Sequence, residues 1–275
     1  MKTNIDNFYL QKEVKMSILT ISDTHSFLDA TRKALESEGL LEDKNNKVAL
    51  LGDILDRGPD AVALTSYLVN LLNEDRLILI RGNHEELFED ALADIRRGRI
   101  WEVATASHHV VNGTFDSIIQ LAGMTPSEAV KYPSELVSRV EESDYYKILL
   151  PACRDYYETD KYILVHGHIP CKIEGYGMEQ KYYYDPDWRN ASPQQWRRAR
   201  WLNGMSLAYD HGIVEKGKTI VVGHWKAVYG HAWIDNSCSE YGPDADFSPY
   251  YGDGIIAIDA CTVRTGMVNC IRLDD

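Results

Sequence analysis

The chain has 275 residues, of which 44% are apolar and 26% charged, so it can bury a full core in one large domain or two smaller ones. Its formal net charge of -13 argues against a general nucleic-acid binder, because such surfaces depend on clustered lysine and arginine. The 5 cysteines are odd in number and form no C-x-x-C, which argues against a disulfide framework or a structural zinc site and favours a reducing, cytoplasmic setting.

Residues 1–15, MKTNIDNFYLQKEVK, form a polar N-terminal extension that lacks the apolar core of a signal peptide. No apolar run reaches the roughly 18 residues that a membrane span needs, so we expect no membrane partner. We expect residues 16–275 to form a single domain.

Short apolar runs rich in β-forming residues recur along this domain, with plausible helices between them. The runs span residues 17–22, 48–51, 77–80, 162–167, 219–223 and 254–259. Continuous rather than alternating apolar runs are typical of strands buried on both faces. Between the second and third runs, Leu64, Leu68 and Leu71 recur at helical spacing, and Pro59 is well placed to open the helix. This alternation predicts an α/β sheet with crossover connections.

Two segments break the alternation. Residues 86–160 have helical patterns and no convincing strand, and we interpret them as a helical insertion or cap. Residues 172–217 are rich in aromatic and polar residues and have an irregular pattern. A loop region of this length usually has a function. Several aromatic side chains of this segment could stack on bases: Tyr176, Tyr182, Tyr183, Tyr184 and Trp188.

Side chains suited to chemistry follow five of the runs, at the carboxyl ends where ligands collect in open α/β sheets. They are Asp23, His25, Asp53, Asn83, His84, His166 and His224. Each has a structural alternative: Asp23 could cap a helix, and Asn83 with Glu86 fits a capping box. The placement of the whole set at one sheet edge is what favours a functional site.

These donors are carboxylate, amide and imidazole groups without a thiolate. Such a set suits manganese, iron, zinc or nickel better than a soft metal or a calcium cage. If two ions bind, one carboxylate must bridge them, and Asp53 is central in the order. Two ions can generate a bridging hydroxide and clamp the attacking and leaving oxygens of a phosphoryl transfer.

Five motifs resemble, in order and spacing, those of the calcineurin-like metallophosphoesterases: SDTH (22–25), GDILDRG (52–58), RGNHE (81–85), VHG (165–167) and VGH (222–224). AIDACT (257–262) is similar to the strand that follows the last metal histidine in bacterial members. The D-R-G and G-N-H-E forms resemble the phosphoprotein phosphatase branch, which includes bacterial and phage serine/threonine phosphatases and symmetrical diadenosine tetraphosphatases. The resemblance implies an α/β fold in which a β-sandwich is flanked by helices and carries a helical cap.

The resemblance also implies two divalent metal ions, manganese first among the candidates. The first ion would be held by Asp23, His25 and Asp53, and the second by Asp53, Asn83, His166 and His224. His84 would protonate the leaving alkoxide, Asp56 would orient it, and Arg57 would bind phosphate oxygens. These roles are chemically coherent, because a poor alkoxide leaving group benefits from a positioned acid and a guanidinium binds phosphate with two hydrogen bonds.

The sequence departs from the broader family in G-H-W-K, where Lys226 replaces the second histidine of G-H-x-H. We therefore expect three protein ligands on the first ion, with His231 as a fallback ligand. His168 stands where eukaryotic enzymes usually have glycine, and it is either a substrate contact or an ordinary loop histidine. For a second phosphate-binding arginine we select Arg200 among the arginines of WRRARW, a run that could also be a solvated helix face.

The leading expectation is a phosphatase that hydrolyses phosphomonoesters by in-line attack of a metal-bridging hydroxide, with a phosphorylated protein or peptide as substrate. The alternative of the same chemistry is a hydrolase of bis(5'-nucleosyl) tetraphosphates or other nucleotides. A non-catalytic metal-binding module would be expected to lose Asp53 or His84, and the chain retains both. A nucleic-acid phosphoesterase is disfavoured by the net charge. The oligomeric state stays open.

Overall fold

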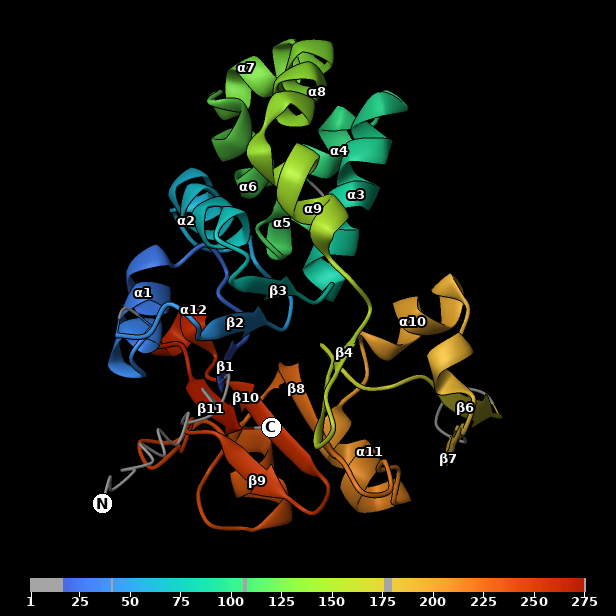
Figure 1. The fold of residues 1–275 in the computed structure, drawn as a ribbon. Coiled ribbons are helices and arrows are strands. Elements are labelled where there is room, and N and C mark those ends of the chain that lie inside the picture. The colour runs from blue at the N-terminus through green and yellow to red at the C-terminus, as the bar shows by residue number, and fades with distance from the viewer. Residues whose placement is uncertain (1–16, 41, 106–107, 176–179, 275) are drawn as a thin grey trace, which may run out of the picture.

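Two stacked β-sheets form the centre of the protein, seen here in a computed structural model that describes residues 17–40, 42–105, 108–175 and 180–274 (Figure 1). The extension expected over residues 1–15 lies outside the described residues. The first sheet has the order β11-β1-β2-β3, with parallel pairing between β1, β2 and β3. Its strands are β1 (Ser17–Ile21), β2 (Lys47–Leu50), β3 (Leu77–Leu79) and β11 (Cys270–Asp274).

The second sheet has the order β4-β5-β8-β10-β9, and its three central strands run parallel. Its strands are β4 (Tyr157–Glu158), β5 (Tyr162–Leu164), β8 (Thr219–Lys226), β9 (Tyr250–Gly252) and β10 (Ile255–Asp259). Buried side chains of both sheets pack into one cluster, to which the first sheet contributes Ile18 and Ile78 and the second Leu164 and Val221. This cluster is the interior of a β-sandwich, as the fold class predicted, and every expected apolar run contains a strand.

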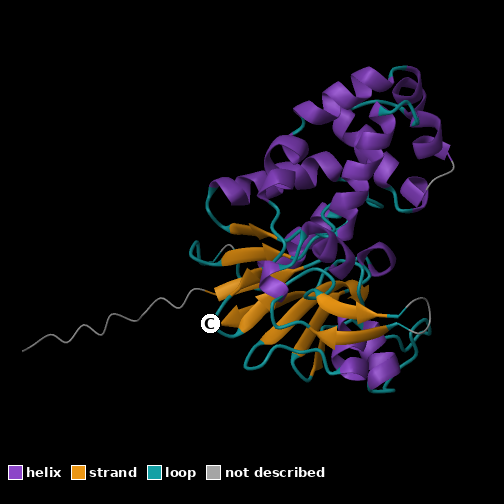
Figure 2. Ribbon diagram, turned by 90° about the vertical axis from the view of Figure 1, so that its right-hand side faces the viewer, coloured by secondary structure: helices purple, strands orange, loops and turns teal. Residues whose placement is uncertain are grey.

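Helices cover the outer face of the first sheet and extend into a cap, which Figure 2 shows as a helical layer beyond the strands. They are α1 (Leu28–Ser37), α2 (Ala61–Asn73), α3 (Asn83–Arg96), α4 (Ile100–Thr105), α5 (His108–Val111), α6 (Thr114–Ala122), α7 (Pro126–Lys131), α8 (Pro133–Glu142), the π-helix η1 (Tyr145–Leu149) and α9 (Leu150–Ala152). Leu19 and Ile21 of β1 share a buried cluster with Phe88 and Ile118 of this layer. The sandwich and the cap therefore have a continuous core, and the short β4 is the strand that the sequence did not indicate within residues 86–160.

The expectation of an irregular segment over residues 172–217 is wrong for most of its length. The segment contains β7 (Lys181–Tyr184), η3 (Trp188–Asn190), α10 (Pro193–Ala199) and α11 (Gly204–His211), and β7 pairs with β6 (Cys171–Glu174). Ser192 and Asn203 supply the side-chain caps of α10 and α11. Trp188 and Trp196 are buried against Tyr156 and form a local core, whereas Tyr183, Tyr184, Trp201 and Tyr209 are exposed.

The remaining described helices are the π-helix η4 (Gly230–Ile234) and α12 (Thr262–Thr265). Within the described ranges, no helix combines the length and the apolar character needed to cross a membrane.

Candidate metal centre

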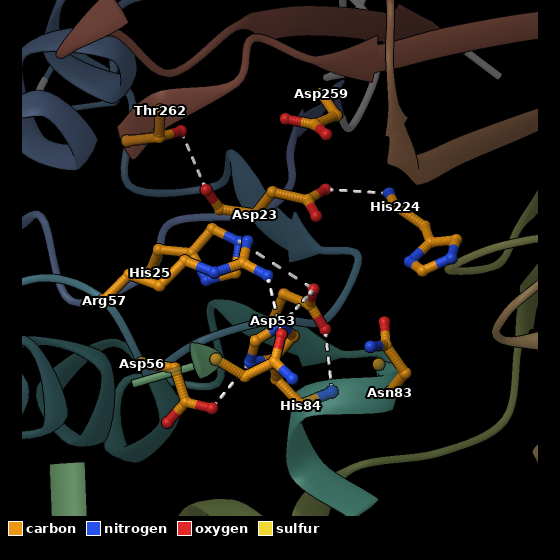
Figure 3. A network of polar contacts seen from close by, with 12 residues as sticks. Asp23, His25, Asp53, Asp56, Arg57, Asn83, His84, His224, Asp259 and Thr262 are labelled. Carbon is orange, nitrogen blue, oxygen red and sulfur yellow. Dashed lines mark hydrogen bonds and ion pairs between the residues drawn. The ribbon is translucent and has the colours of Figure 1, made fainter. Parts of the chain in front are cut away.

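The chemistry-capable side chains converge where the strands end, on both sheets. Asp23 and His25 follow β1, Asp53 follows β2, and His84 lies in the first turn of α3 (Figure 3). From the second sheet, His166 follows β5 and His224 lies within β8, next to each other with ring centroids 5.1 Å apart. These groups come from segments up to two hundred residues apart in the chain, so the sandwich assembles the site.

Left-handed backbone conformations aim several of these side chains. Positive φ angles occur at Asp23 (51°), His25 (45°), Asp53 (55°) and His224 (62°). Non-glycine residues rarely adopt this region, and they persist there only where the surroundings hold them. Here backbone hydrogen bonds hold the loops, since Asp23 donates to the carbonyl of Gly52 and His25 to that of Asp53.

Asp53 lies at the centre of the cluster. Its Oδ1 lies 3.2 Å from Nε2 of His166, and its Oδ2 lies 3.9 Å from Nε2 of His25. Among the residues that the structure describes, two sets of three side chains have potential ligand atoms within 4.8 Å of one another: His25, Asp53 and His84, and Asp53, His166 and His224. Asp53 is the member common to both sets. The first set contains His84 in place of Asp23, which the sequence led us to expect. Asp23 instead accepts a hydrogen bond of 3.0 Å at its Oδ2 from the backbone N–H of His224.

Potential metal-binding atoms face one another at the centre. Nδ1 of His166 lies 2.6 Å from the carbonyl oxygen of Leu51, a contact that only a protonated Nδ1 satisfies. In the neutral ring, which is the form that binds metal, Nε2 has a lone pair, and this nitrogen faces Oδ1 of Asn83 at 2.8 Å and Oδ1 of Asp53 at 3.2 Å. With this ring neutral, three lone-pair donors face one another, an arrangement that a cation among them stabilises. The residues therefore fit a divalent metal ion.

The electrostatics of the site support the same conclusion. Burial raises the pKa of Asp53 well above its ordinary value, and the neighbouring Asp23 and Glu85 raise it further. Burial, His84 and Arg57 lower the pKa of His25 to about 3. Burial also lowers the pKa of His224 well below its ordinary value. Neutral imidazoles are the form that binds metal, and the crowded carboxylates would be stabilised by added positive charge.

His84 is held by the cap as well as by the sandwich. Its Nδ1 lies 2.6 Å from Oδ2 of Asp56, and the same oxygen accepts a hydrogen bond of 2.8 Å from the hydroxyl of Thr114 on α6. The Ser117 hydroxyl accepts a hydrogen bond from the backbone N–H of Asp56. Burial raises the pKa of Asp56 to about 7 and lowers that of His84 to about 3. Burial thus favours the neutral pair in the absence of substrate.

Arg57 is also positioned by the cap. Its Nη1 donates to Nε2 of His25 at 2.9 Å, and its Nη2 lies 3.2 Å from Oδ1 of Asn112. The sequence did not identify Asn112, Thr114 or Ser117, because nothing in their local pattern distinguishes them from ordinary helix residues.

Glu85 connects the loop that follows β2 with the loop that follows β3. Its fully buried carboxylate accepts hydrogen bonds from the backbone N–H groups of Gly82 (2.6 Å), Asp53 (3.0 Å) and Ile54 (3.0 Å). The capping box expected for Asn83 and Glu86 is therefore shifted by one residue, since Gly82 is the N-cap of α3. Asn83 occupies the first helical position, which leaves its side-chain amide free to face the centre.

The structure leaves several other expected residues apart from this cluster. His168 is buried with its Nδ1 3.1 Å from the carbonyl of Ile169, and burial lowers its pKa to about 4. Arg200 is buried in ion pairs with Glu86 and Asp155, so its charge is already compensated. His231 contacts the carbonyl of Ser248 at 3.2 Å.

A cavity of about 560 Å³ opens beside the cluster. Its lining includes His25, Arg57 and His224 together with Trp201, Trp225, Lys226, Glu240, Tyr241 and Asp259. Neither His168 nor Arg200 is among the lining residues. Asp259 is a further buried carboxylate that the sequence did not identify. Burial raises the pKa of Asp259 well above its ordinary value, and the nearby Asp23 raises it further.

Comparison with known proteins gives a family match over most of the chain. The sequence profile described as "Calcineurin-like phosphoesterase" matches residues 16–256. Symmetrical bis(5'-nucleosyl)-tetraphosphatases of Buchnera aphidicola are 36% identical over 70 residues, which is 26% of this chain. That match spans 24% of the relative, so this chain covers about a quarter of the length of these curated relatives.

The matches among solved structures include the following two. A mutant of a cold-active protein tyrosine phosphatase has a TM-score of 0.50 and 14% identity, covering 95% of this chain and 76% of its own. A metallophosphoesterase from Sphaerobacter thermophilus has a TM-score of 0.41 and 16% identity, covering 89% of this chain and 76% of its own. At 14% identity the likeness to the first of these structures concerns the fold alone.

Proposed function

This chain belongs to the calcineurin-like phosphoesterase family, and we propose that it is a two-metal phosphatase that hydrolyses phosphomonoesters. The observation that carries the proposal is the position of Asp53, which is shared by both sets of potential metal ligands. A single carboxylate between two sets is what a pair of neighbouring ions requires.

We assign the first ion to Asp23, His25 and Asp53, and the second to Asp53, Asn83, His166 and His224. Manganese is our first choice, with iron, zinc or nickel as alternatives, because the donors are oxygen and nitrogen. When bound, such ions supply Lewis acidity that activates water at neutral pH and offsets charge on the phosphoryl oxygens.

The protein's own residues have three roles in this proposal. Arg57, held toward the cavity by Asn112, binds phosphate oxygens through its guanidinium. His84 gives a proton to the leaving alkoxide, and Asp56 fixes its Nδ1. The lowered pKa of His84 makes its protonated form a strong acid, and the negative charge of a bound phosphate favours that form.

Two substrate classes remain as proposals. The D-R-G and G-N-H-E motifs favour a phosphoserine or phosphothreonine protein. Nucleotides, including bis(5'-nucleosyl) tetraphosphates, are favoured by the names of the curated relatives and by the aromatic lining of the cavity. All 5 cysteines are free, which agrees with the cytoplasmic setting that we propose.

The metal assignment is tested with Asp53→Asn. Elemental analysis of purified protein should find two divalent ions per wild-type chain and fewer in the variant, with nearly complete loss of p-nitrophenyl phosphate hydrolysis. Asp75→Asn is the matched control, because the Asp75 side chain is 95% exposed and forms a surface ion pair with Lys47. Full metal content and full rate in Asp53→Asn would remove Asp53 from the bridging role.

The acid role is tested with His84→Ala. Its loss of rate should be larger for an alkyl phosphate than for p-nitrophenyl phosphate, whose good leaving group scarcely needs a proton. Equal losses for the two substrates would exclude His84 as the proton donor.

A further inference from the structure

Three solvent-exposed aromatic side chains line the cavity beside the metal centre, and we call them the aromatic wall. Trp201 follows α10, Trp225 lies in β8, and Tyr241 lies in the connection between η4 and β9. Their exposed fractions are 46%, 39% and 64%. Three separate segments thus bring large rings to one cavity.

The aromatic wall begins at a proposed metal ligand. The ring centroid of His224 lies 5.8 Å from that of Trp201 and 6.4 Å from that of Trp225, both edge to face. A group that extends from a phosphate at the metal centre into the cavity therefore meets these rings first. Aromatic surface left open to water at such a place is typical of a ligand site.

Polar groups lie at the edge of the aromatic wall. The Lys226 amine lies 4.8 Å from the ring centroid of Tyr241 and 3.6 Å from a carboxylate oxygen of Glu240. Both side chains also line the cavity, so it offers a hydrogen-bond donor and an acceptor next to the rings.

We propose that the aromatic wall is a nucleobase subsite, so that the preferred substrates are phosphate esters whose leaving group carries a nucleoside. The proposal rests on the proposed phosphatase function and specifies its substrate class. Planar bases stack on aromatic side chains, and their edges carry donors and acceptors that Lys226 and Glu240 can meet.

The size and chemistry of the cavity favour a nucleoside over the side chains of a phosphoprotein. A volume of about 560 Å³ lies within the range of small-molecule sites, roughly 300–1,000 Å³. Serine and threonine phosphates have no ring to stack. The ring of phosphotyrosine is bonded directly to the phosphate oxygen, so it would remain near Arg57 and leave much of the cavity unfilled.

This subsite replaces the one that the sequence suggested. Trp188 is fully buried, and Tyr182 packs against His211 with ring centroids 5.1 Å apart. Tyr183 and Tyr184 are partly exposed on the β6–β7 hairpin, but neither lines the cavity beside the metal centre. Tyr176 lies outside the described residues.

The test compares adenosine 5'-monophosphate with ribose 5-phosphate, which share the ester and differ only in the base. For the manganese-loaded wild-type enzyme we expect kcat/KM to be higher for the nucleotide by roughly 5- to 150-fold. Trp225→Ala and Trp201→Ala should each bring this ratio toward one. The ratio cancels any general loss of activity. Trp101→Ala is the control, because Trp101 is 67% exposed on α4 in the cap, and it should leave the ratio unchanged.

A binding measurement separates this proposal from the proposed function. Adenosine should quench tryptophan fluorescence saturably in chelator-treated protein, and Trp225→Ala should weaken this binding. Saturable binding without hydrolysis of any phosphate ester would overturn the phosphatase proposal and support the subsite. Hydrolysis of both sugar phosphates with a wild-type ratio near one, or a higher kcat/KM for a phosphoserine peptide than for the nucleotide, would overturn the subsite and leave the phosphatase proposal intact.

Discussion

Replacing Glu85 by glutamine should destabilise the protein far more than its small change in shape suggests. The carboxylate accepts hydrogen bonds from three backbone N–H groups in two loops, those of Gly82, Asp53 and Ile54. A glutamine amide keeps one oxygen acceptor and turns the other position into a donor. At least one buried N–H group is then left facing an NH₂ group.

The magnitude follows from these contacts. An unsatisfied buried donor costs about 1–3 kcal/mol, and the remaining hydrogen bonds lose the charged acceptor that makes them strong. We expect Glu85→Gln to lower the free energy of unfolding by about 2–4 kcal/mol.

Urea unfolding of chelator-treated protein, followed by circular dichroism, measures this difference without a contribution from metal binding. Glu89→Gln is the control on the same helix, because the Glu89 side chain is 46% exposed and pairs with Arg81 at 2.6 Å. Its effect should stay below about 1 kcal/mol. If both variants unfold at the same urea concentration, the hydrogen bonds of Glu85 do not hold the two loops together.

Other outcomes follow from the same structure. Thr114→Val removes the hydroxyl that donates to Asp56, and it should lower kcat for an alkyl phosphate about tenfold. The kcat for p-nitrophenyl phosphate should fall less, and equal decreases would mean that Thr114 does not act through His84. Metal at a hundred times its Kd should stabilise wild type by about 2.7 kcal/mol per site, and chelation should remove this stabilisation. The effect of chelation should be much smaller for Asp53→Asn, and an unchanged effect would contradict the metal assignment. Hydrogen bonding to Arg189 lowers the pKa of Glu158 from 4.5 to about 2, so its stabilising contribution is present above pH 4.5 and is lost as the pH falls through about 2. Urea midpoints at pH 6 and pH 3 should therefore differ less in Glu158→Gln than in wild type, and equal differences would refute this contribution.

The sheets and the cluster of potential ligands could be predicted from the sequence because both follow from local patterns. Continuous apolar runs mark strands buried on both faces, and Asp53 and His166 lie in the loops just after two of these strands, β2 and β5. The carboxyl ends of parallel strands meet, so side chains far apart in sequence were expected to be close in space.

The contacts made by the cap could not be predicted in this way. Thr114 reaches Asp56 across 58 residues of chain, and this contact depends on how α6 docks on the sandwich. The exposure of aromatic residues depends on tertiary packing in the same manner, which is why Trp188 is buried and Trp225 is exposed. The shifted capping box also depends on tertiary contacts. Gly82 with Glu85 and Asn83 with Glu86 have equal spacing, and the hydrogen bonds from the distant Asp53 and Ile54 to Glu85 favour the former.

The left-handed backbone at the metal centre also limits how the site could be redesigned. Aspartate, asparagine and histidine tolerate positive φ better than most residues, whereas β-branched side chains do not. At Asp23, Asp53 and His224 the ligand and the loop conformation therefore depend on the same residue choice. A designer who wished to change the preferred metal could exchange oxygen and nitrogen donors at these positions. Any other donor would require the loops to be rebuilt first.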